Sequence, residues 1–154
     1  MIKVITYGTY DLLHYGHINL LERAKALGDY LIVGITSDDY DKARGKINNQ
    51  QSLVERISAV MATGLVDEVI VEEYEGQKID DIRRYGIDIF AIGSDWEGKF
   101  DYLKEKGIDL QNALKTHGTS EPLWRLDSGV WATANVSALD LRIIYIGGKR
   151  NDRY

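Results

Sequence analysis

The sequence predicts an α/β domain built on a parallel sheet with helices on both faces. Short apolar runs alternate with stretches of helical spacing through the first two thirds of the 154 residues, which is typical of strands joined by crossover helices. Residues 30–36 are nearly all apolar, as expected of a strand covered on both faces. This pattern indicates a three-layer, Rossmann-like fold. Ligands of such sheets bind beyond the carboxyl ends of the strands, so segments 8–17, 37–46 and 93–98 are expected to form the site.

The first elements follow from clear local signals. Residues 3–7 form a short apolar run that predicts a strand, and residues 18–26 have helical spacing with Gly28 placed as a C-terminal cap. The second strand is expected at 30–36. A polar loop is expected to follow it, over residues 37–51.

A capping box predicts the start of the next helix. Ser52 and Glu55 stand three residues apart, the spacing at which their side chains and backbone N–H groups cap each other, and the helix is expected to run to about residue 61. The alternation continues with a strand, a helix, a strand and a short helix, at 68–71, 78–85, 87–92 and 100–106.

The last third of the chain has a different pattern. The alternation weakens from about residue 107, and a turn-rich segment at 115–122 holds the only proline. Residues 141–146 are expected to form a final strand. We therefore divide the chain into a domain over 1–106 and a divergent tail over 107–154, which is expected to pack on the same domain and to fray at its end.

Composition narrows the class of protein. A net charge of −5 argues against a general nucleic-acid-binding surface. No run approaches the roughly 18 apolar residues of a membrane span, and the first residues enter a strand pattern without a signal peptide. The absence of cysteine excludes disulfides and thiol nucleophiles. We expect a cytoplasmic protein that binds neither nucleic acid nor membrane.

Two of the three histidines, His14 and His17, stand at the junction of the first strand and the first helix. A helix N-terminus offers free backbone N–H groups and a partial positive charge, which bind phosphate. Two imidazoles there add donors for charge developing on a phosphoryl group. Cations gather in the polar loop at Lys42, Arg44 and Lys46, although such a loop is also typical of a solvated surface. The site is expected to bind a nucleotide, with Mg²⁺ offsetting the remaining triphosphate charge.

Residues 9–17, Thr-Tyr-Asp-Leu-Leu-His-Tyr-Gly-His, resemble the H-x-G-H signature of the cytidylyltransferase-like nucleotidyltransferase superfamily. Further segments resemble the bacterial glycerol-3-phosphate cytidylyltransferases, at 5–9, 20–25, 66–69 and 93–101. The resemblance extends to about residue 106, so residues 1–106 are expected to be a nucleotidyltransferase domain.

This resemblance implies a Mg²⁺-dependent homodimer that transfers CMP from CTP to glycerol 3-phosphate and releases pyrophosphate. The product, CDP-glycerol, implies a place in teichoic acid or capsular polymer synthesis. Catalytic roles are implied for His14, His17 and Lys46, and acceptor-binding roles for Arg56 and Asp67. Nucleotide-binding roles are implied for Gly8, Thr9, Asp11, Gly16, Asp95 and Trp96. No third ligand accompanies the histidines, so no metal-ligating side chains are expected.

Two departures from the family pattern leave other interpretations open. Gly64 stands where the family usually has an arginine, which bears on the acceptor. The family's closing phosphate-binding segment, Arg-Thr-x-Gly-Ile-Ser-Thr-Thr, has only a partial echo at 116–120. A second interpretation therefore changes the substrates, to ATP with a flavin or pantetheine phosphate, or to CTP with choline or ethanolamine phosphate. A third is a nucleotide-binding module with impaired catalysis.

Overall fold

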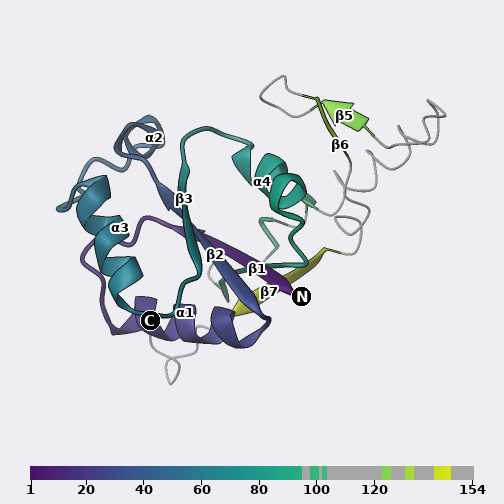
Figure 1. Ribbon diagram of the computed structural model, residues 1–154. Coiled ribbons are helices and arrows are strands. Elements are labelled where there is room, and N and C mark those ends of the chain that lie inside the picture. Colours follow the sequence, from purple (N-terminus) through teal and green to yellow (C-terminus); the bar gives the residue numbers. More distant parts are fainter. Residues whose placement is uncertain (95–97, 101, 104–122, 126–130, 134–140, 147–154) are drawn as a thin grey trace.

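The computed structural model describes residues 1–94, 98–100, 102–103, 123–125, 131–133 and 141–146 (Figure 1). At its centre lies a five-stranded, all-parallel sheet in the order β3-β2-β1-β4-β7. Its strands are β1 Lys3–Gly8, β2 Tyr30–Thr36, β3 Glu68–Glu72, β4 Ile89–Gly93 and β7 Arg142–Ile146. A two-stranded antiparallel sheet is formed by β5 Leu123–Arg125 and β6 Trp131–Thr133. The α/β class expected from the sequence is confirmed.

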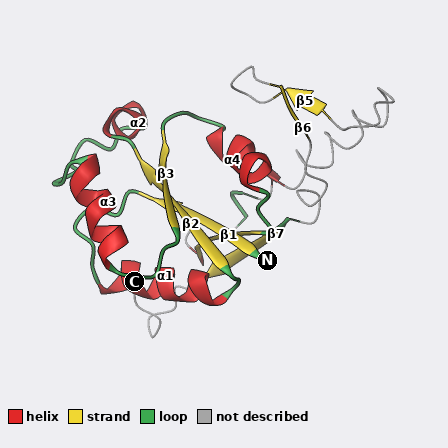
Figure 2. Cartoon of the chain, viewed as in Figure 1, coloured by secondary structure: helices red, strands yellow, loops and turns green. Residues whose placement is uncertain are grey.

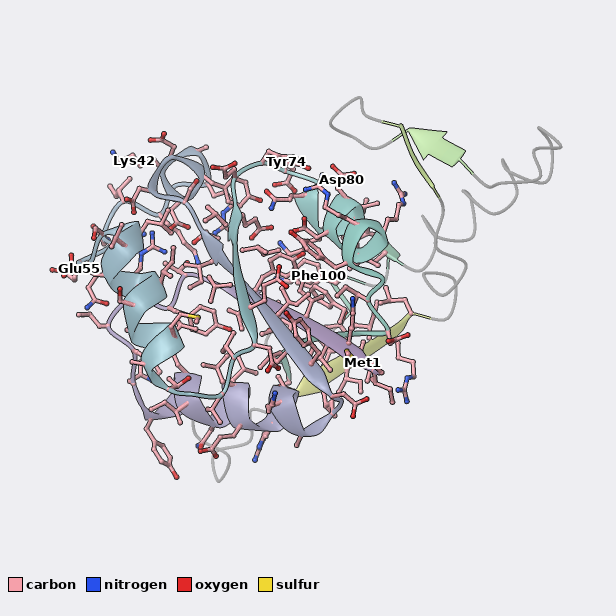
Figure 3. The ribbon with its side chains drawn as sticks, in the orientation of Figure 1. Met1, Lys42, Glu55, Tyr74, Asp80 and Phe100 are labelled. Atoms are coloured by element: carbon pink, nitrogen blue, oxygen red, sulfur yellow. The ribbon has the colours of Figure 1, made fainter. Side chains whose placement is uncertain are left out.

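Helices cover both faces of the parallel sheet (Figure 2). They are α1 Tyr15–Ala26, α3 Leu53–Ala62 and α4 Gln77–Tyr85. A fourth helix, α2 Asp38–Ala43, follows β2 and contributes no residue to the buried clusters on the two faces. On one face, Leu21 and Ala24 of α1 and Val60 of α3 are buried against the sheet. On the other face, Ile79 and Ile82 of α4 are buried against it. The side chains of both layers are drawn in Figure 3, and together with the sheet they make a three-layer domain.

Most expected elements are confirmed. The capping box that starts α3 is present, since Ser52 Oγ accepts the Glu55 N–H at 3.2 Å and Glu55 Oε1 accepts the Ser52 N–H at 3.0 Å. The final strand is confirmed as β7, which lies parallel to β4. A part of the segment assigned to the tail therefore completes the main sheet. Of the short helix expected over 100–106, residues 102 and 103 are helical, and 101 and 104–106 lie outside the described residues.

The polar loop expected over 37–51 contains a helix that the sequence did not predict. Ser37 caps α2, because its Oγ accepts the Tyr40 N–H at 3.1 Å. Within α2, Tyr40 and Asp41 are buried. The prediction was wrong because six residues rich in aspartate show no apolar periodicity, whereas the helix is stabilised by its cap and by tertiary burial.

The first helix also starts earlier than expected. It begins at Tyr15 rather than Ile18, because His14 acts as its N-cap. The sheet is parallel, so the last residues of β1, β2 and β3, Gly8, Thr36 and Glu72, lie at one edge. The segments that follow these strands meet at this carboxyl edge, where parallel sheets bind ligands.

Candidate functional site

A tight loop joins β1 to α1 at the carboxyl edge of the sheet. Tyr10 and Leu12 have positive φ angles of 55° and 50°, a conformation that costs about 1 kcal/mol for a residue with a side chain. Gly8 is required by close approach, because a Cβ at this position would lie 2.8 Å from the ring of Tyr10. Such strain persists only where the surrounding structure holds it, and it is concentrated at binding sites.

The two histidines of the loop cap the first helix. His14 is the N-cap of α1, and its Nδ1 accepts the Gly16 N–H at 3.0 Å. His17 is the third helical residue, and its Nδ1 accepts the His14 N–H at 3.1 Å. The two rings are stacked, with centroids 3.8 Å apart. The histidines therefore form a capping box, in the place usually taken by a hydroxyl and a carboxylate or amide.

The capping box fixes where each imidazole carries its proton. An Nδ1 that accepts a hydrogen bond leaves the proton of the neutral ring on Nε2. Burial, and secondarily the neighbouring His14, lower the pKa of His17 to about 4, so this ring is neutral at pH 7. Each histidine thus offers one Nε2–H donor beside the N-terminus of α1. These groups suit the oxygens of a reacting phosphoryl group.

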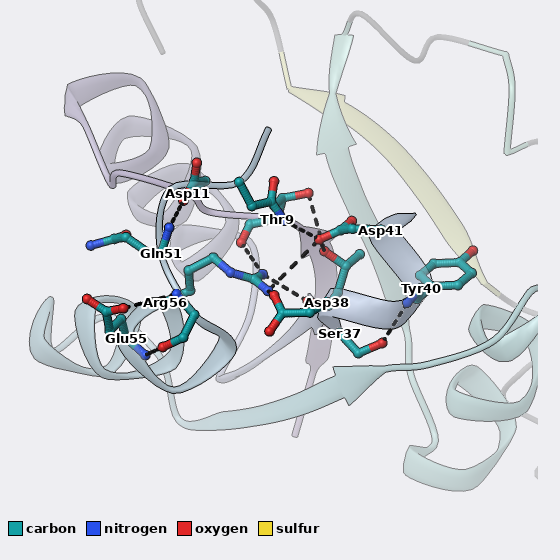
Figure 4. A network of polar contacts seen from close by, with 12 residues as sticks. Thr9, Asp11, Ser37, Asp38, Tyr40, Asp41, Gln51, Glu55 and Arg56 are labelled. Carbon is teal, nitrogen blue, oxygen red and sulfur yellow. Dashed lines mark hydrogen bonds and ion pairs between the residues drawn. The ribbon is translucent and has the colours of Figure 1, made fainter. Parts of the chain in front are cut away.

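Asp11 connects this loop to the segment before α3. Its two carboxylate oxygens accept the N–H groups of Gln50 and Gln51, each at 2.9 Å. Gln51 Oε1 in turn accepts the Leu12 N–H at 2.9 Å. Figure 4 shows Asp11 beside Gln51. The contacts give Asp11 a positioning role within the chain, and its contact with a nucleotide stays a prediction.

Lys46 reaches the end of β1 from the segment after α2. Its Nζ donates to Thr9 Oγ1 at 3.3 Å, and Thr9 Oγ1 lies 3.2 Å from Thr36 Oγ1 at the end of β2. The structure therefore brings together Lys46 and Thr9, which the sequence singled out separately. Asp95 and Trp96, the remaining nucleotide-binding candidates, lie outside the described residues.

Arg56 lies inside the domain rather than on a binding surface. Its side chain has no solvent exposure, and Nη1 donates to the carbonyl oxygens of Thr9 at 2.9 Å and Thr36 at 2.8 Å. Nη2 binds Asp38 at 2.8 Å and lies 3.9 Å from Asp41 (Figure 4). These contacts join the ends of β1 and β2 to α2. We therefore interpret Arg56 as a positioning residue for the loop, in place of the acceptor contact implied by the resemblance.

Asp67 lies at the amino ends of the strands, at the other end of the sheet from the histidine loop. It immediately precedes β3, where its Oδ2 accepts the Leu31 N–H at 2.8 Å and forms an ion pair with Lys25. Amino ends of parallel strands are remote from the carboxyl edge that holds His14. Within one chain, Asp67 therefore does not join the other site residues, and the expectation that it binds the acceptor is not supported here.

A cavity of about 280 Å³ opens at the carboxyl edge, on the side of the loop that faces α4. Thr9 and Lys46 line it, so it reaches the start of the loop that follows β1, but neither His14 nor His17 is among its lining residues. Its other charged lining residues are Arg44, Glu72, Glu75 and Lys78, and its aromatic ones are Tyr7, Tyr40, Phe100 and Tyr102. A mixed set of charges around a concave surface is suited to a polar, phosphorylated ligand.

Lys78 is fixed from three directions within this cavity. Its Nζ forms an ion pair with Glu72 at 2.5 Å, and the two side chains are 12% and 2% exposed. The same Nζ lies 4.7 Å from the ring centroid of Tyr7 and 5.4 Å from that of Phe100. Cation–π contacts and the ion pair hold the ammonium group in one place. It is thereby available as a fixed positive charge for a ligand.

Several cavity residues were not singled out from the sequence, among them Tyr7, Tyr40, Glu72, Glu75 and Lys78. A signal for four of these five was present. Residues 72–78 follow the third strand, and the same rule that selected the segments after the other strands applies to them. Tyr40 had a signal of the same kind, because it lies in segment 37–46, which the rule selected although its helix was not predicted. Tyr7 carried no such signal, because it belongs to a strand.

The described residues do not form a metal site of their own. No group of three or more histidine, aspartate or glutamate side chains lies close enough together to hold a metal ion in the described ranges. Mg²⁺ in nucleotide sites is bound largely by substrate phosphates and water. The dependence on Mg²⁺ stays a prediction.

Comparison with known proteins agrees with this geometry. Residues 5–124 match the model of the family described as Cytidylyltransferase-like. The chain belongs to the cytidylyltransferase-like family. In this family member, the H-x-G-H loop and the cavity lie at the carboxyl ends of the parallel strands.

Characterised relatives of this family member include two close ones. The glycerol-3-phosphate cytidylyltransferase of Bacillus spizizenii is 54% identical over 105 residues, covering 68% of this chain and 81% of that protein. The glycerol-3-phosphate cytidylyltransferase of Staphylococcus aureus is 48% identical over 120 residues, covering 78% and 89%. The FAD synthase of Thermococcus sibiricus is 37% identical over 108 residues, covering 68% and 71%.

A solved structure supports the fold. The lipopolysaccharide core biosynthesis protein of Thermoplasma volcanium superposes with a TM-score of 0.62 at 26% identity, covering 95% of this chain and 96% of that one.

Proposed function

We propose that this protein is a CTP-dependent cytidylyltransferase that transfers CMP to glycerol 3-phosphate, forming CDP-glycerol and pyrophosphate. The observation that carries the reaction type is the pair of Nε2–H donors fixed by the capping box of His14 and His17. Identities of 54% and 48% to two glycerol-3-phosphate cytidylyltransferases support the choice of substrates. The product would enter teichoic acid or capsular polymer synthesis.

The proposed reaction needs no general base. A phosphate oxygen of the acceptor attacks the α-phosphorus of CTP, the new P–O bond forms, and the bond to pyrophosphate breaks in line with it. The attacking phosphate is already ionised, so catalysis is positioning and charge stabilisation. His14 and His17 would donate from Nε2 to phosphate oxygens, and Lys46 beside Thr9 would add a positive charge. Mg²⁺ would be carried by the phosphates of CTP and would neutralise part of their charge.

A second substrate pair is favoured by one observation. The FAD synthase of Thermococcus sibiricus shares 37% identity with this chain, which supports testing ATP with a flavin phosphate. Enzymes of one fold differ in substrate through the residues of their site, so fold alone does not decide between them.

A panel of substrates tests the proposal. Pyrophosphate release is measured with CTP or ATP, in Mg²⁺, against glycerol 3-phosphate, flavin mononucleotide, phosphocholine and phosphoethanolamine. The proposal expects release only from CTP with glycerol 3-phosphate, and CDP-glycerol as the product by ³¹P NMR. Release from ATP with the flavin would replace it. Binding of CTP without release from any pair would favour the module with impaired catalysis.

We also propose a homodimer in the cytoplasm. In the described sheet β3 is an edge strand, and its apolar Val69, Ile70 and Val71 are only partly buried. An open edge of this kind is usually covered by another chain or element. No helix in the described part of the chain is long and apolar enough to cross a membrane. Sedimentation equilibrium tests the dimer, with Val69→Lys expected to shift it toward monomer.

A further inference from the structure

One wall of the cavity carries negative charge, which is unexpected beside a phosphate-binding loop. Glu72 and Glu75 line it together with the cations Arg44, Lys46 and Lys78. Carboxylates repel the phosphates of both proposed substrates. The two carboxylates have different partners.

The charge of Glu72 is balanced by a partner within the protein. It is almost fully buried and forms the ion pair with Lys78 at 2.5 Å. A buried carboxylate with a fixed ammonium partner is neutralised locally, and it orients that ammonium group. Glu72 thus acts through Lys78.

Glu75 has a different environment. Its side chain is exposed at the cavity, and its Oε2 accepts a hydrogen bond from Tyr40 Oη at 2.9 Å. Among the described residues, no lysine, arginine or histidine lies within ion-pair distance of it. A carboxylate has acceptor sites for several donors, and one tyrosine occupies only part of them.

Tyr40 holds this carboxylate in a defined position. The tyrosine is 8% exposed and belongs to α2, and the guanidinium of Arg44 lies 4.6 Å from its ring centroid. Burial and the bond to Glu75 raise the pKa of Tyr40, so its hydroxyl keeps its proton and remains a donor. The free acceptor sites of Glu75 are therefore presented at the cavity wall by a rigid support.

A fixed carboxylate in a cavity for phosphorylated ligands is suited to hydroxyl groups. Hydroxyls donate to a carboxylate in charge-assisted hydrogen bonds, which are stronger than neutral ones. A cationic head group such as choline would also be attracted by Glu75, but it would meet three cations in the same cavity. A ligand that carries both a phosphate and hydroxyls can place its phosphate near the cations of the cavity and its hydroxyls near Glu75.

We propose that Glu75, positioned by Tyr40, is a specificity-determining residue that accepts hydrogen bonds from the hydroxyl groups of the acceptor. The proposal rests on the proposed function, and it refines it by selecting polyol phosphates over acceptors that lack hydroxyls. The sugar hydroxyls of CTP are the alternative donors to Glu75, and the experiment distinguishes them from the hydroxyls of the acceptor.

The test compares discrimination between substrates. Steady-state kinetics are measured for glycerol 3-phosphate and for its two monodeoxy analogues, the phosphates of 1,2-propanediol and 1,3-propanediol. CTP is compared with 2′-deoxy-CTP and 3′-deoxy-CTP in parallel. The variants are Glu75→Ala, Glu75→Gln and Tyr40→Phe. Glu73→Gln is the matched control, because Glu73 is exposed in the same segment and does not line the cavity.

Glu75→Ala should lower kcat/KM for glycerol 3-phosphate about tenfold or more, as expected on losing a charge-assisted hydrogen bond. The preference for glycerol 3-phosphate over at least one deoxy analogue should fall by a similar factor. KM for CTP and the preference for CTP over its deoxy analogues should not change. Glu75→Gln and Tyr40→Phe should have smaller effects in the same direction, and Glu73→Gln none.

The outcomes separate this inference from the proposed function. Wild-type protein that does not use glycerol 3-phosphate overturns the proposed function. Wild-type turnover with an unchanged acceptor preference in Glu75→Ala overturns the inference alone. A changed preference for CTP over its deoxy analogues, with the acceptor preference unchanged, also overturns it, because Glu75 would then bind the sugar of the nucleotide.

Discussion

The backbone N–H of His14 donates to Nδ1 of His17 at 3.1 Å, so the start of α1 determines which nitrogen of His17 carries the proton. The same turn both stabilises the helix and prepares a donor for a phosphoryl group. Structure and proposed chemistry therefore depend on the same hydrogen bonds.

The pKa of His17 can be measured directly. Burial and His14 lower it to about 4, so about one molecule in ten should be protonated at pH 5, whereas a free imidazole would be almost fully protonated there. Chemical shifts of the histidine Cε1–H groups, recorded between pH 8 and pH 5 and assigned with His17→Gln, should show little change for His17. A midpoint near 6.5 would contradict the structure.

The sign of the linked stability follows from this depressed pKa. The unfolded chain binds a proton at His17 more readily than the folded one, so the stabilisation is full above pH 6.5. It is lost as the pH falls from there through about 4.

Arg56 should be essential for stability. Arg56→Met would leave the carbonyl oxygens of Thr9 and Thr36 without their guanidinium donor, and it would remove the ion pair with Asp38. Removing one partner of a buried ionic network costs about 3 to 5 kcal/mol, and urea unfolding measures the loss. Arg56→Lys should recover only part, because one ammonium cannot reproduce the planar fork.

The control for Arg56 is Lys25→Met. Lys25 and Asp67 form an ion pair with side chains 35% and 32% exposed, and its loss should cost under about 1 kcal/mol. Equal losses in the two variants would contradict the positioning role of Arg56. CTP titration of Arg56→Lys should also show weaker binding, since Arg56 holds the Thr9 carbonyl.

Asp81 should make the stability depend on pH in the opposite direction. It is buried in α4, which raises its pKa to about 6 even though Tyr7 and Gln77 donate to it. The folded protein binds this proton more tightly than the unfolded chain. The contribution of Asp81 to the free energy of unfolding is therefore full below about pH 4 and is lost as the pH rises through 6. The loss is at most about 3 kcal/mol.

Urea unfolding of wild type and Asp81→Asn between pH 4 and pH 8 isolates this contribution. The stability of wild type relative to the variant should fall between about pH 4 and 6 and then stay constant. Tyr7→Phe should move the fall to higher pH, because the Tyr7 hydroxyl lowers the pKa of Asp81. A difference that does not vary with pH would contradict the interpretation of Asp81.

The sequence predicted the features that depend on residues close together in the chain. The capping box of Ser52 and Glu55 was identified from spacing alone, and the histidine junction was placed correctly at the carboxyl edge. Hydrophobic runs gave every strand of the parallel sheet within two residues. These features depend on neighbours in the chain, which a pattern can show.

The features that the sequence did not show depend on packing between segments that are far apart in the chain. Arg56 lies on a helix where a charged residue usually faces solvent, and only the convergence of β1, β2 and α2 buries it. Lys78 and Glu75 become cavity residues because α4 starts at the same edge as the ends of β1 and β2. Asp67 falls outside the site because it stands before its strand rather than after it.

Pyrophosphate release by variants that keep the helix caps tests the central claim most directly. His14→Asn and His17→Gln retain a side-chain oxygen for the capping bonds but lack the imidazole Nε2–H. Unfolding free energies should stay within about 1 kcal/mol of wild type, while kcat with CTP and glycerol 3-phosphate should fall about 100-fold or more in each variant. Wild-type kcat in either capped variant would contradict the claim that both histidines stabilise the reacting phosphates.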